Sequence, residues 1–336
     1  MSPRSPDELE GPVGAARVPD RSLWVTWEVH RRTREIARTL RVPLHEILAS
    51  RGGGAKYPGL LARTLRLLQR ERPGVLFVQC PSVVLGWLVA VLQPLLKYRL
   101  VADLHNEAVK PFVHSTGSYR TLLRRIHATA ALSLVSNSAL ETTIAANGGR
   151  PFVLPDRLPR LQAAPADVRV GRGKTIAFVC TFAPDEPWEA VVRAARSLPD
   201  GVDVVVTGRV PAGVDTKGCR NLRFAGFLPE AEYVDTLAGA DAVMDLTEME
   251  DCLVCGGYEA VALERPLITS DTRALRSYFR LGTVYTTHEP GALACAMLSA
   301  MDRSGELEGE MAVLQPELRA DWDRRARELV ARIEES

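Results

Sequence analysis

The chain has 336 residues, of which 46% are hydrophobic and 25% charged, a composition typical of water-soluble globular proteins. Its formal net charge is +1, so the sequence predicts no strongly basic surface for nucleic acid. The six cysteines suggest no disulfide framework, and a reducing cytoplasm is the location that fits best. The length favours two domains.

The N-terminal half begins with a segment that should not fold. Residues 1–20 are rich in proline, glycine and charge and lack an apolar core, which predicts a disordered tail and not a signal peptide. Short apolar runs then alternate with helical patterns, which predicts an N-terminal domain over residues 21–156. Its strands are expected at 23–27, 42–48, 75–79, 99–103, 131–135 and 152–156.

One predicted helix in this half, over residues 83–92, is almost wholly apolar. Ser82 is placed to cap it, and Pro94 should interrupt it. The run is shorter than the about twenty residues that span a bilayer. A buried helix is therefore expected, and peripheral contact with a membrane is a hypothesis.

Two loops at the ends of predicted strands carry histidine. His30, Arg31 and Arg32 follow the first strand and would contact donor phosphate or acceptor, unless they only form a solvated basic helix start. His105 follows the strand at 99–103, and it is our candidate for a base or a hydrogen-bond donor. The alternative is that Asp103 and His105 satisfy backbone groups of their loop.

The second half repeats the alternation after a linker rich in proline, alanine and charge at residues 157–173. Strands are expected at 175–179, 202–207, 222–226, 242–246, 267–270 and 282–286. We predict a second domain over residues 174–310 and a terminal helical segment over 311–336. The fold class is α/β with two Rossmann-like parallel sheets.

The stretch 245–271 is the most informative part of the chain. Acidic residues follow a buried strand, a turn is expected at Gly256 and Gly257, and a helix should run from about Tyr258 to Glu264. Ligands of open parallel sheets bind at the carboxyl ends of the strands. The two glycines would let backbone N–H groups approach a phosphate, and Glu259 would face the same crevice. Such a site suits a sugar nucleotide.

The spacing of Asp251 and Glu259, with the run 258–271 after it, resembles the donor motif of group 1 glycosyltransferases of the GT-B fold. That resemblance implies two Rossmann-like domains that face each other across a cleft, with a terminal helix that crosses back to the first. It also implies that Glu259 binds the donor ribose and that Asp251, where the family usually has glutamate, lies near the transferred sugar.

A second resemblance concerns residues 75–106, which are similar to part of the mannosyltransferase that acts on dolichol-linked chitobiose. It implies that His105 lies near the reacting sugars. The turn at 180–188 lacks the Gly-Arg and lysine with which many relatives hold the donor diphosphate, so Arg209 is our candidate for that charge and Lys217 a weaker one.

From these resemblances we expect a glycosyltransferase that moves a sugar from a UDP or GDP sugar to a saccharide or lipid-linked saccharide, as in polysaccharide biosynthesis. We expect no cofactor and no metal ion, because a clear Asp-x-Asp motif is lacking, and a cytoplasmic protein with peripheral contact at the inner face of a membrane. The alternatives are a sugar-nucleotide epimerase of the same fold and a non-catalytic sugar-nucleotide-binding protein.

Overall fold

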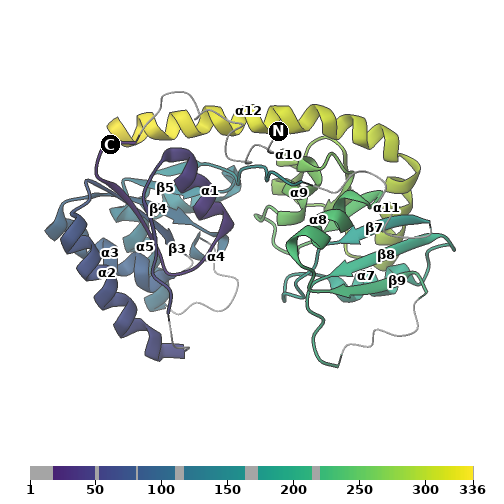
Figure 1. Ribbon diagram of the computed structural model, residues 1–336, viewed down its shortest axis with the longest axis horizontal. Coiled ribbons are helices and arrows are strands. Elements are labelled where there is room, and N and C mark those ends of the chain that lie inside the picture. Colours follow the sequence, from purple (N-terminus) through teal and green to yellow (C-terminus); the bar gives the residue numbers. More distant parts are fainter. Residues whose placement is uncertain are drawn as a thin grey trace, which may run out of the picture. The chain divides into compact units, whose positions relative to one another are not determined.

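The computed structural model describes residues 18–49, 53–80, 82–109, 117–162, 173–213 and 220–335. Most of the predicted tail and of the predicted linker, namely residues 1–17 and 163–172, lie outside these ranges. The chain divides into two compact units (Figure 1). Unit 1 is Met1–Arg157 with Asp321–Ser336, and unit 2 is Leu158–Ala320.

Unit 1, within its described residues, contains a six-stranded parallel sheet in the order β2-β1-β3-β4-β5-β6. The strands are β1 Ser22–Thr26, β2 Leu44–Glu46, β3 Val75–Cys80, β4 Arg99–Leu104, β5 Leu132–Val135 and β6 Pro151–Val153. Its helices are α1 Arg31–Leu40, α2 Tyr57–Glu71, α3 Val83–Leu96, α4 Asn106–Val109, α5 Gly117–Thr129 and α6 Glu141–Ala146, with short 3-10 turns η2 Gly53–Lys56 and η3 Ser138–Leu140.

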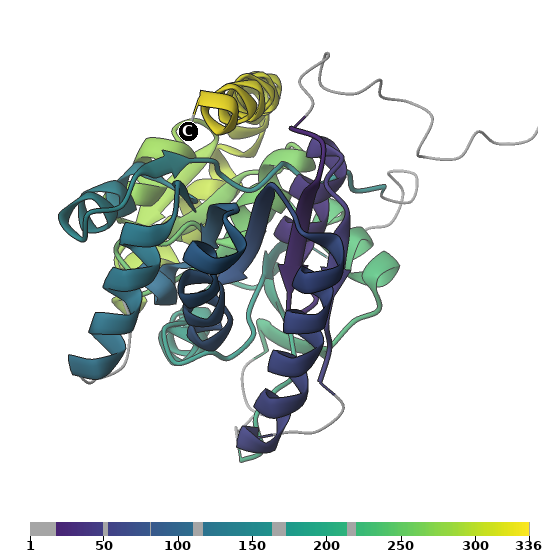
Figure 2. The ribbon, with the colours of Figure 1, turned by 90° about the vertical axis from the view of Figure 1, so that its left-hand side faces the viewer.

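Helices cover both faces of this sheet, as right-handed connections between parallel strands require. The apolar side chains of α2, α3 and α5 share one core with the strands, and Figure 2 views the molecule from the side of unit 1. On the other face, α1 packs with the last part of the C-terminal helix around Trp24 and Phe77, whose rings stack 5.0 Å apart. Since both faces are buried, central strands such as β3 are nearly continuous apolar runs, whereas the edge strand β2 is half-buried.

Helix α3 corrects one expectation from the sequence. Ser82 caps it by accepting a hydrogen bond from the Leu85 amide, as expected. Pro94, however, lies inside the helix and does not end it. A proline so near the C-terminal end removes only one backbone hydrogen bond, and Lys97 closes the helix by donating its amide to the carbonyl of Gln93.

Unit 2 contains, in the part that the structure describes, a second six-stranded parallel sheet in the order β12-β11-β10-β7-β8-β9. The strands are β7 Lys174–Phe178, β8 Val202–Thr207, β9 Leu222–Gly226, β10 Ala242–Asp245, β11 Leu267–Ser270 and β12 Thr283–Thr286. Its helices are α7 Trp188–Ala195, α8 Glu230–Ala238, α9 Cys255–Ala262, α10 Arg273–Tyr278 and α11 Pro290–Asp302.

The helices of unit 2 also form two layers. Helices α7 and α11 bury their apolar side chains against one face of the sheet, and α8, α9 and α10 bury theirs against the other. The long helix α12, Ser304–Glu335, begins in unit 2, and its residues from Asp321 onward belong to unit 1. Among the helices of the described ranges, none is long and apolar enough to cross a bilayer.

Candidate functional site

The order of the strands in unit 2 places the topological switch point of its sheet, where open parallel sheets form a crevice for ligands, between β7 and β10. From β7 the chain proceeds to β8 on one side and later returns to β10 on the other, so the connections diverge at the carboxyl ends of these two strands. The two loops that follow the strands are joined there. Asp185 accepts hydrogen bonds from the Thr247 hydroxyl through its carboxylate and from the Glu248 amide through its carbonyl, each at 2.7 Å.

Helix α9 begins at Cys255, three residues before the predicted start. Gly256 and Gly257 are therefore in its first turn and do not form a separate turn before it. The Gly256 amide donates to Oδ2 of Asp245 at 2.6 Å, and the Gly257 amide donates to the Val254 carbonyl at 3.2 Å. Both amides that were expected to bind phosphate thus donate to groups of the chain itself.

Close packing explains why glycine occupies both positions. A Cβ atom on Gly256 would lie 2.8 Å from Oδ2 of Asp245, and one on Gly257 would lie 2.6 Å from the ring of Phe279. Real Cβ atoms do not approach other heavy atoms so closely. The glycines allow α9 to lie directly against Asp245 and Phe279.

Asp245, the last residue of β10, is a buried carboxyl group to which the sequence analysis gave no role. Burial raises its pKa well above the usual range, and the charges of Glu186, Glu259 and Asp185 raise it further, whereas the Gly256 amide opposes the shift. Several carboxyl groups thus gather at one end of β7 and β10. The only signal in the sequence was an acidic residue that ends an apolar run.

Glu259 is buried inside α9, with 7% of its surface exposed. The hydroxyl of Tyr233, on α8, donates to its Oε2 at 2.5 Å. Burial and the charge of Glu259 raise the pKa of Tyr233, so the hydroxyl stays protonated and remains a donor. Tyr233 was missed from the sequence because it lies 26 residues from its partner.

The other predicted donor-site residues lie in loops of unit 2. Asp251 is half-buried in the turn just before α9, so it comes from the same connection as Glu259. Arg209 is exposed in the loop after β8. Strand β8 is not next to β10, because β7 lies between the two strands in the sheet. Gly208, with a φ of +93°, brings that loop against the Cys180 carbonyl, where a Cβ atom would lie 1.9 Å away. Lys217 lies outside the described residues.

Unit 1 has its own point of divergence, between β1 and β3, and the two predicted histidines meet near it. The rings of His30 and His105 are 4.5 Å apart and edge to face. Gln79, in β3, accepts from the Thr26 hydroxyl at 2.6 Å, which turns its amide nitrogen toward Nε2 of His105 at 3.3 Å. Nε2 of His105 is then the acceptor, and its ring proton is on Nδ1.

Burial keeps His105 neutral at pH 7. Burial is the main cause that lowers the pKa of His105, and the charges of His30 and Arg32 lower it further, while Asp103 acts in the opposite direction. Nε2 of His105 lies 3.9 Å from Oδ2 of Asp103. A neutral imidazole beside a carboxylate can accept a proton from a hydroxyl group.

Arg32 is buried in an ion-pair network, so two carboxylates neutralise its charge. Its Nε donates to Oδ1 of Asp103 at 2.9 Å, and its Nη1 donates to Oδ1 of Asp156 at 2.6 Å. Within this cluster of described residues, three buried atoms nevertheless lack a hydrogen-bond partner: Nη2 of Arg32, Oδ2 of Asp103 and Nδ1 of His30. Buried polar atoms without a partner are costly, so each of them calls for an explanation such as a bound water or ligand.

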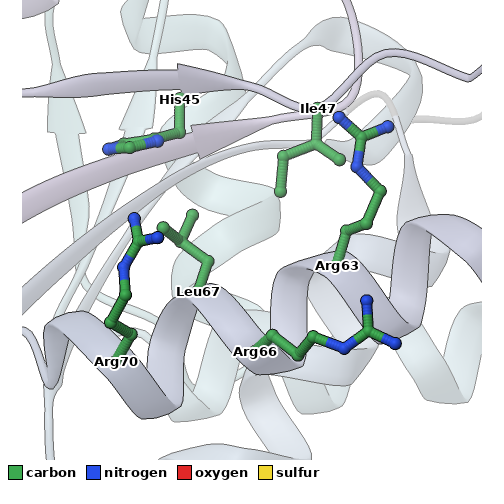
Figure 3. A pocket seen from close by; sticks show the side chains of 6 residues that line it. All are labelled: His45, Ile47, Arg63, Arg66, Leu67 and Arg70. Atoms are coloured by element: carbon green, nitrogen blue, oxygen red, sulfur yellow. The ribbon is translucent and has the colours of Figure 1, made fainter.

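A basic cavity lies apart from both crevices, between the edge strand β2 and helix α2 (Figure 3). It has a volume of about 450 Å³. Its lining combines three arginines of α2 with a histidine of β2 and two apolar side chains, namely Arg63, Arg66, Arg70, His45, Ile47 and Leu67. The spacing of the arginines places them on one side of α2, and Figure 3 shows Arg63 and Arg70 directed toward the strand.

Several solved structures share the backbone arrangement of this chain. Anabaena HepE in complex with UDP is 12% identical, with a TM-score of 0.71 over 93% of this chain and 98% of HepE. Sucrose-phosphate synthase of Thermosynechococcus elongatus is 14% identical, with a TM-score of 0.69 over 93% and 100%. A Listeria monocytogenes protein described as a UDP-N-acetylglucosamine 2-epimerase is 12% identical, with a TM-score of 0.66 over 94% and 96%.

No protein-family model matches the chain, and no curated protein matches it. At identities of 12% and 14%, a structural likeness establishes the fold and nothing finer. With its two six-stranded parallel sheets, each between layers of helices, the chain has the GT-B fold.

Proposed function

We propose that the chain is a glycosyltransferase that moves a sugar from a nucleoside diphosphate sugar to a saccharide or lipid-linked saccharide acceptor. The observation that carries this proposal is Glu259, a buried carboxylate beside the crevice of unit 2 whose orientation Tyr233 fixes. A carboxylate held in this way accepts hydrogen bonds from a pair of ribose hydroxyls. HepE, which shares the fold, was solved with UDP and with UDP-glucose, so uridine diphosphate is the first nucleotide to test and guanosine diphosphate the second.

Each remaining candidate receives a separate role. Asp251 contacts the donor sugar and stabilises positive charge as the glycosidic bond opens. Arg209 supplies positive charge to the departing diphosphate without a metal ion, a role that gains weight because the amides of Gly256 and Gly257 donate elsewhere. His105, held neutral by burial, accepts a proton from the acceptor hydroxyl or hydrogen-bonds to the sugar.

A thermal-shift series with the diphosphates of uridine, guanosine and thymidine tests the donor site. A ligand that binds only the folded chain raises its melting temperature with concentration. We expect one nucleotide to do so, and Glu259→Gln to lose the shift. The matched control is Glu232→Gln, which changes an exposed glutamate in the first turn of α8. If no nucleotide shifts the intact protein, the proposal is wrong.

The likeness to the epimerase of Listeria monocytogenes keeps one second candidate function open. Incubation with a labelled UDP sugar alone separates the two activities. An epimerase would change the sugar of the nucleotide without an acceptor, whereas a transferase should release labelled product only when an acceptor is present. Activity that persists with EDTA would support a metal-independent transfer. Nucleotide binding with neither product would indicate a non-catalytic binding protein.

We also propose that the acceptor is lipid-linked and that unit 1 contacts an anionic membrane surface. Trp87 and Leu95 of α3 are large apolar side chains that are exposed by 40% and 75%. The arginines of the basic cavity add positive charge to the same unit. Flotation with phosphatidylcholine vesicles, with and without phosphatidylglycerol, is the test. Binding should need the anionic lipid and weaken in the variant R63Q/R66Q/R70Q, and protein that stays unbound would refute the contact.

A further inference from the structure

The turn after β7 is an anion site that the chain fills with its own carboxylate. Oε2 of Glu186 accepts hydrogen bonds from the amides of Thr181, at 2.8 Å, and Ala183, at 3.0 Å. Oε1 accepts from the Thr181 hydroxyl at 2.8 Å. The thiol of Cys180 donates to Oε2 at 3.3 Å. Four donors from three residues, Cys180, Thr181 and Ala183, thus converge on one carboxylate.

The backbone of this turn explains why the donors converge. Phe182 has a φ of +61°, in the left-handed region that side chains other than glycine rarely adopt. A left-handed residue within a turn directs successive amides to one side and creates a concave anion site. The rings of Trp188 and Phe224 lie 5.6 and 6.5 Å from the Phe182 ring and hold it in place. The turn therefore has a fixed shape.

The same turn lies at the crevice where a ligand is expected. It follows β7, next to the carboxyl end of β10, and Asp185 joins it to the loop after β10. Thr181 is exposed and Glu186 only half-buried, so a dissolved anion can reach the donors. The charge of Glu186 also contributes to the raised pKa of the buried Asp245. Glu186 therefore adds negative charge at a place where a diphosphate would need positive groups.

We infer that Glu186 competes with the phosphate groups of a ligand for the donors of Thr181 and Ala183, and so limits the affinity of this crevice for nucleoside diphosphates. This inference rests on the proposed function in taking the ligand to be a nucleoside diphosphate. A phosphate that enters the turn must displace the carboxylate and meets its charge, whereas a ligand whose phosphate avoids the turn does not. Glu186 is thus a specificity-determining residue, and its removal improves binding.

Glu186→Gln tests the inference, because the amide oxygen can still accept from the turn while the charge is gone. We expect UDP and inorganic pyrophosphate, measured by titration calorimetry, to bind about tenfold more tightly than to the wild-type chain. Glu189→Gln, which removes a charge from the first turn of α7, is the matched control and should change affinity by less than about twofold. If Glu186→Gln does not fold, Glu186→Asp is the alternative test of the inference. It keeps the charge, but its shorter side chain leaves the donors of the turn, so it too should bind pyrophosphate more tightly.

The outcomes separate this inference from the proposed function. If the wild-type chain binds UDP and the folded Glu186→Gln variant binds it equally or less tightly, the inference is wrong and the proposed function stands. If the wild-type chain binds no nucleotide but the variant binds pyrophosphate, the inference stands and the proposed function loses its support. If neither protein binds either anion, both are refuted.

Discussion

Tyr233 and Glu259 form a partly buried hydrogen bond of 2.5 Å that links α8 to α9 in unit 2. Burial and the charge of Glu259 raise the pKa of Tyr233, so its hydroxyl stays protonated and donates at neutral pH. The carboxylate therefore has a fixed direction before any ligand arrives. A preorganised acceptor of this kind gives affinity without a further cost in side-chain entropy.

Tyr233→Phe should lower the affinity for UDP by about tenfold, because a hydrogen bond to a charged group contributes about 1.5–3 kcal/mol. Titration calorimetry measures the affinity, and urea unfolding the stability. Tyr98→Phe is the matched control, since it removes a hydroxyl that donates to the Val89 carbonyl at 2.5 Å in unit 1. Both variants should lose similar stability, but only the first should lose affinity. Equal UDP binding by Tyr233→Phe and wild type would contradict the assigned role.

Gly257→Ala should destabilise the protein by about 1–3 kcal/mol, because the added carbon would lie 2.6 Å from the ring of Phe279. Gly309→Ala is the matched control in the second turn of α12, where a Cβ atom meets nothing within 4 Å. It should stabilise by about 0.5–1 kcal/mol, since alanine favours helices over glycine. Chemical unfolding measures both changes. A stabilising Gly257→Ala would mean that Phe279 can move away.

Arg32→Ala should cost about 3–5 kcal/mol, because it leaves the carboxylate of Asp103 buried without its ion-pair partner. Arg34→Ala is the control on the same helix. Arg34 also pairs with a carboxylate, that of Glu46 at 2.7 Å, but its side chain is 52% exposed, so little stability should be lost. Equilibrium unfolding in urea measures the difference. Similar losses from the two substitutions would show that the Arg32 network is not desolvated.

The acid limb of the pH–rate profile should lie below pH 6.5, the ordinary pKa of histidine, because burial lowers the pKa of His105. His105→Gln should remove this limb and reduce kcat by about a hundredfold or more if His105 is the base. The measurement is the rate of sugar transfer across pH with saturating donor. A variant that keeps both the limb and the rate would exclude His105 from the chemistry.

The lowered pKa of His105 also makes the stability of the protein depend on pH. As the pH falls below 6.5, the unfolded chain binds a proton at residue 105 that the folded chain binds only at lower pH. The free energy of unfolding therefore decreases with falling pH through the interval between the two pKa values. His105→Gln should flatten this decrease, which urea unfolding at several pH values would detect.

The strands could be predicted from the sequence because burial on both faces leaves plain apolar runs, such as 75–80 and 242–245. Both His30 and His105 follow such runs, so they could be selected as candidates, and the structure brings their rings together. Predictions from neighbouring residues were wrong where a contact with a residue distant in the sequence shapes the local structure. Two successive glycines predict a turn, yet α9 includes them, and glycine is needed at position 257 because a Cβ atom there would meet the ring of Phe279, 22 residues later.

The polar pairs of the site could not be predicted from the sequence either, because their partners are distant in the chain. Arg32 pairs with residues 71 and 124 positions away, and no spacing rule relates them. The role of Glu186 was hidden differently, because its partners are backbone amides only three to five residues before it. The direction of these amides depends on the left-handed conformation of Phe182. Phenylalanine, unlike glycine, does not indicate such a conformation in a sequence.

The division of α12 between the units has a consequence for how the protein is made. Trp322, Leu329 and Ile333 complete an apolar layer with Trp24 and Phe77, which belong to the first strands of unit 1. During synthesis, unit 1 emerges first but is completed last, because residues 321–336 belong to it. At 5–20 residues per second the ribosome needs roughly 10–40 s to travel from residue 157 to residue 336. Throughout that interval one face of the first sheet lacks part of its helical cover, and nascent chains are exposed to aggregation unless a chaperone shields it.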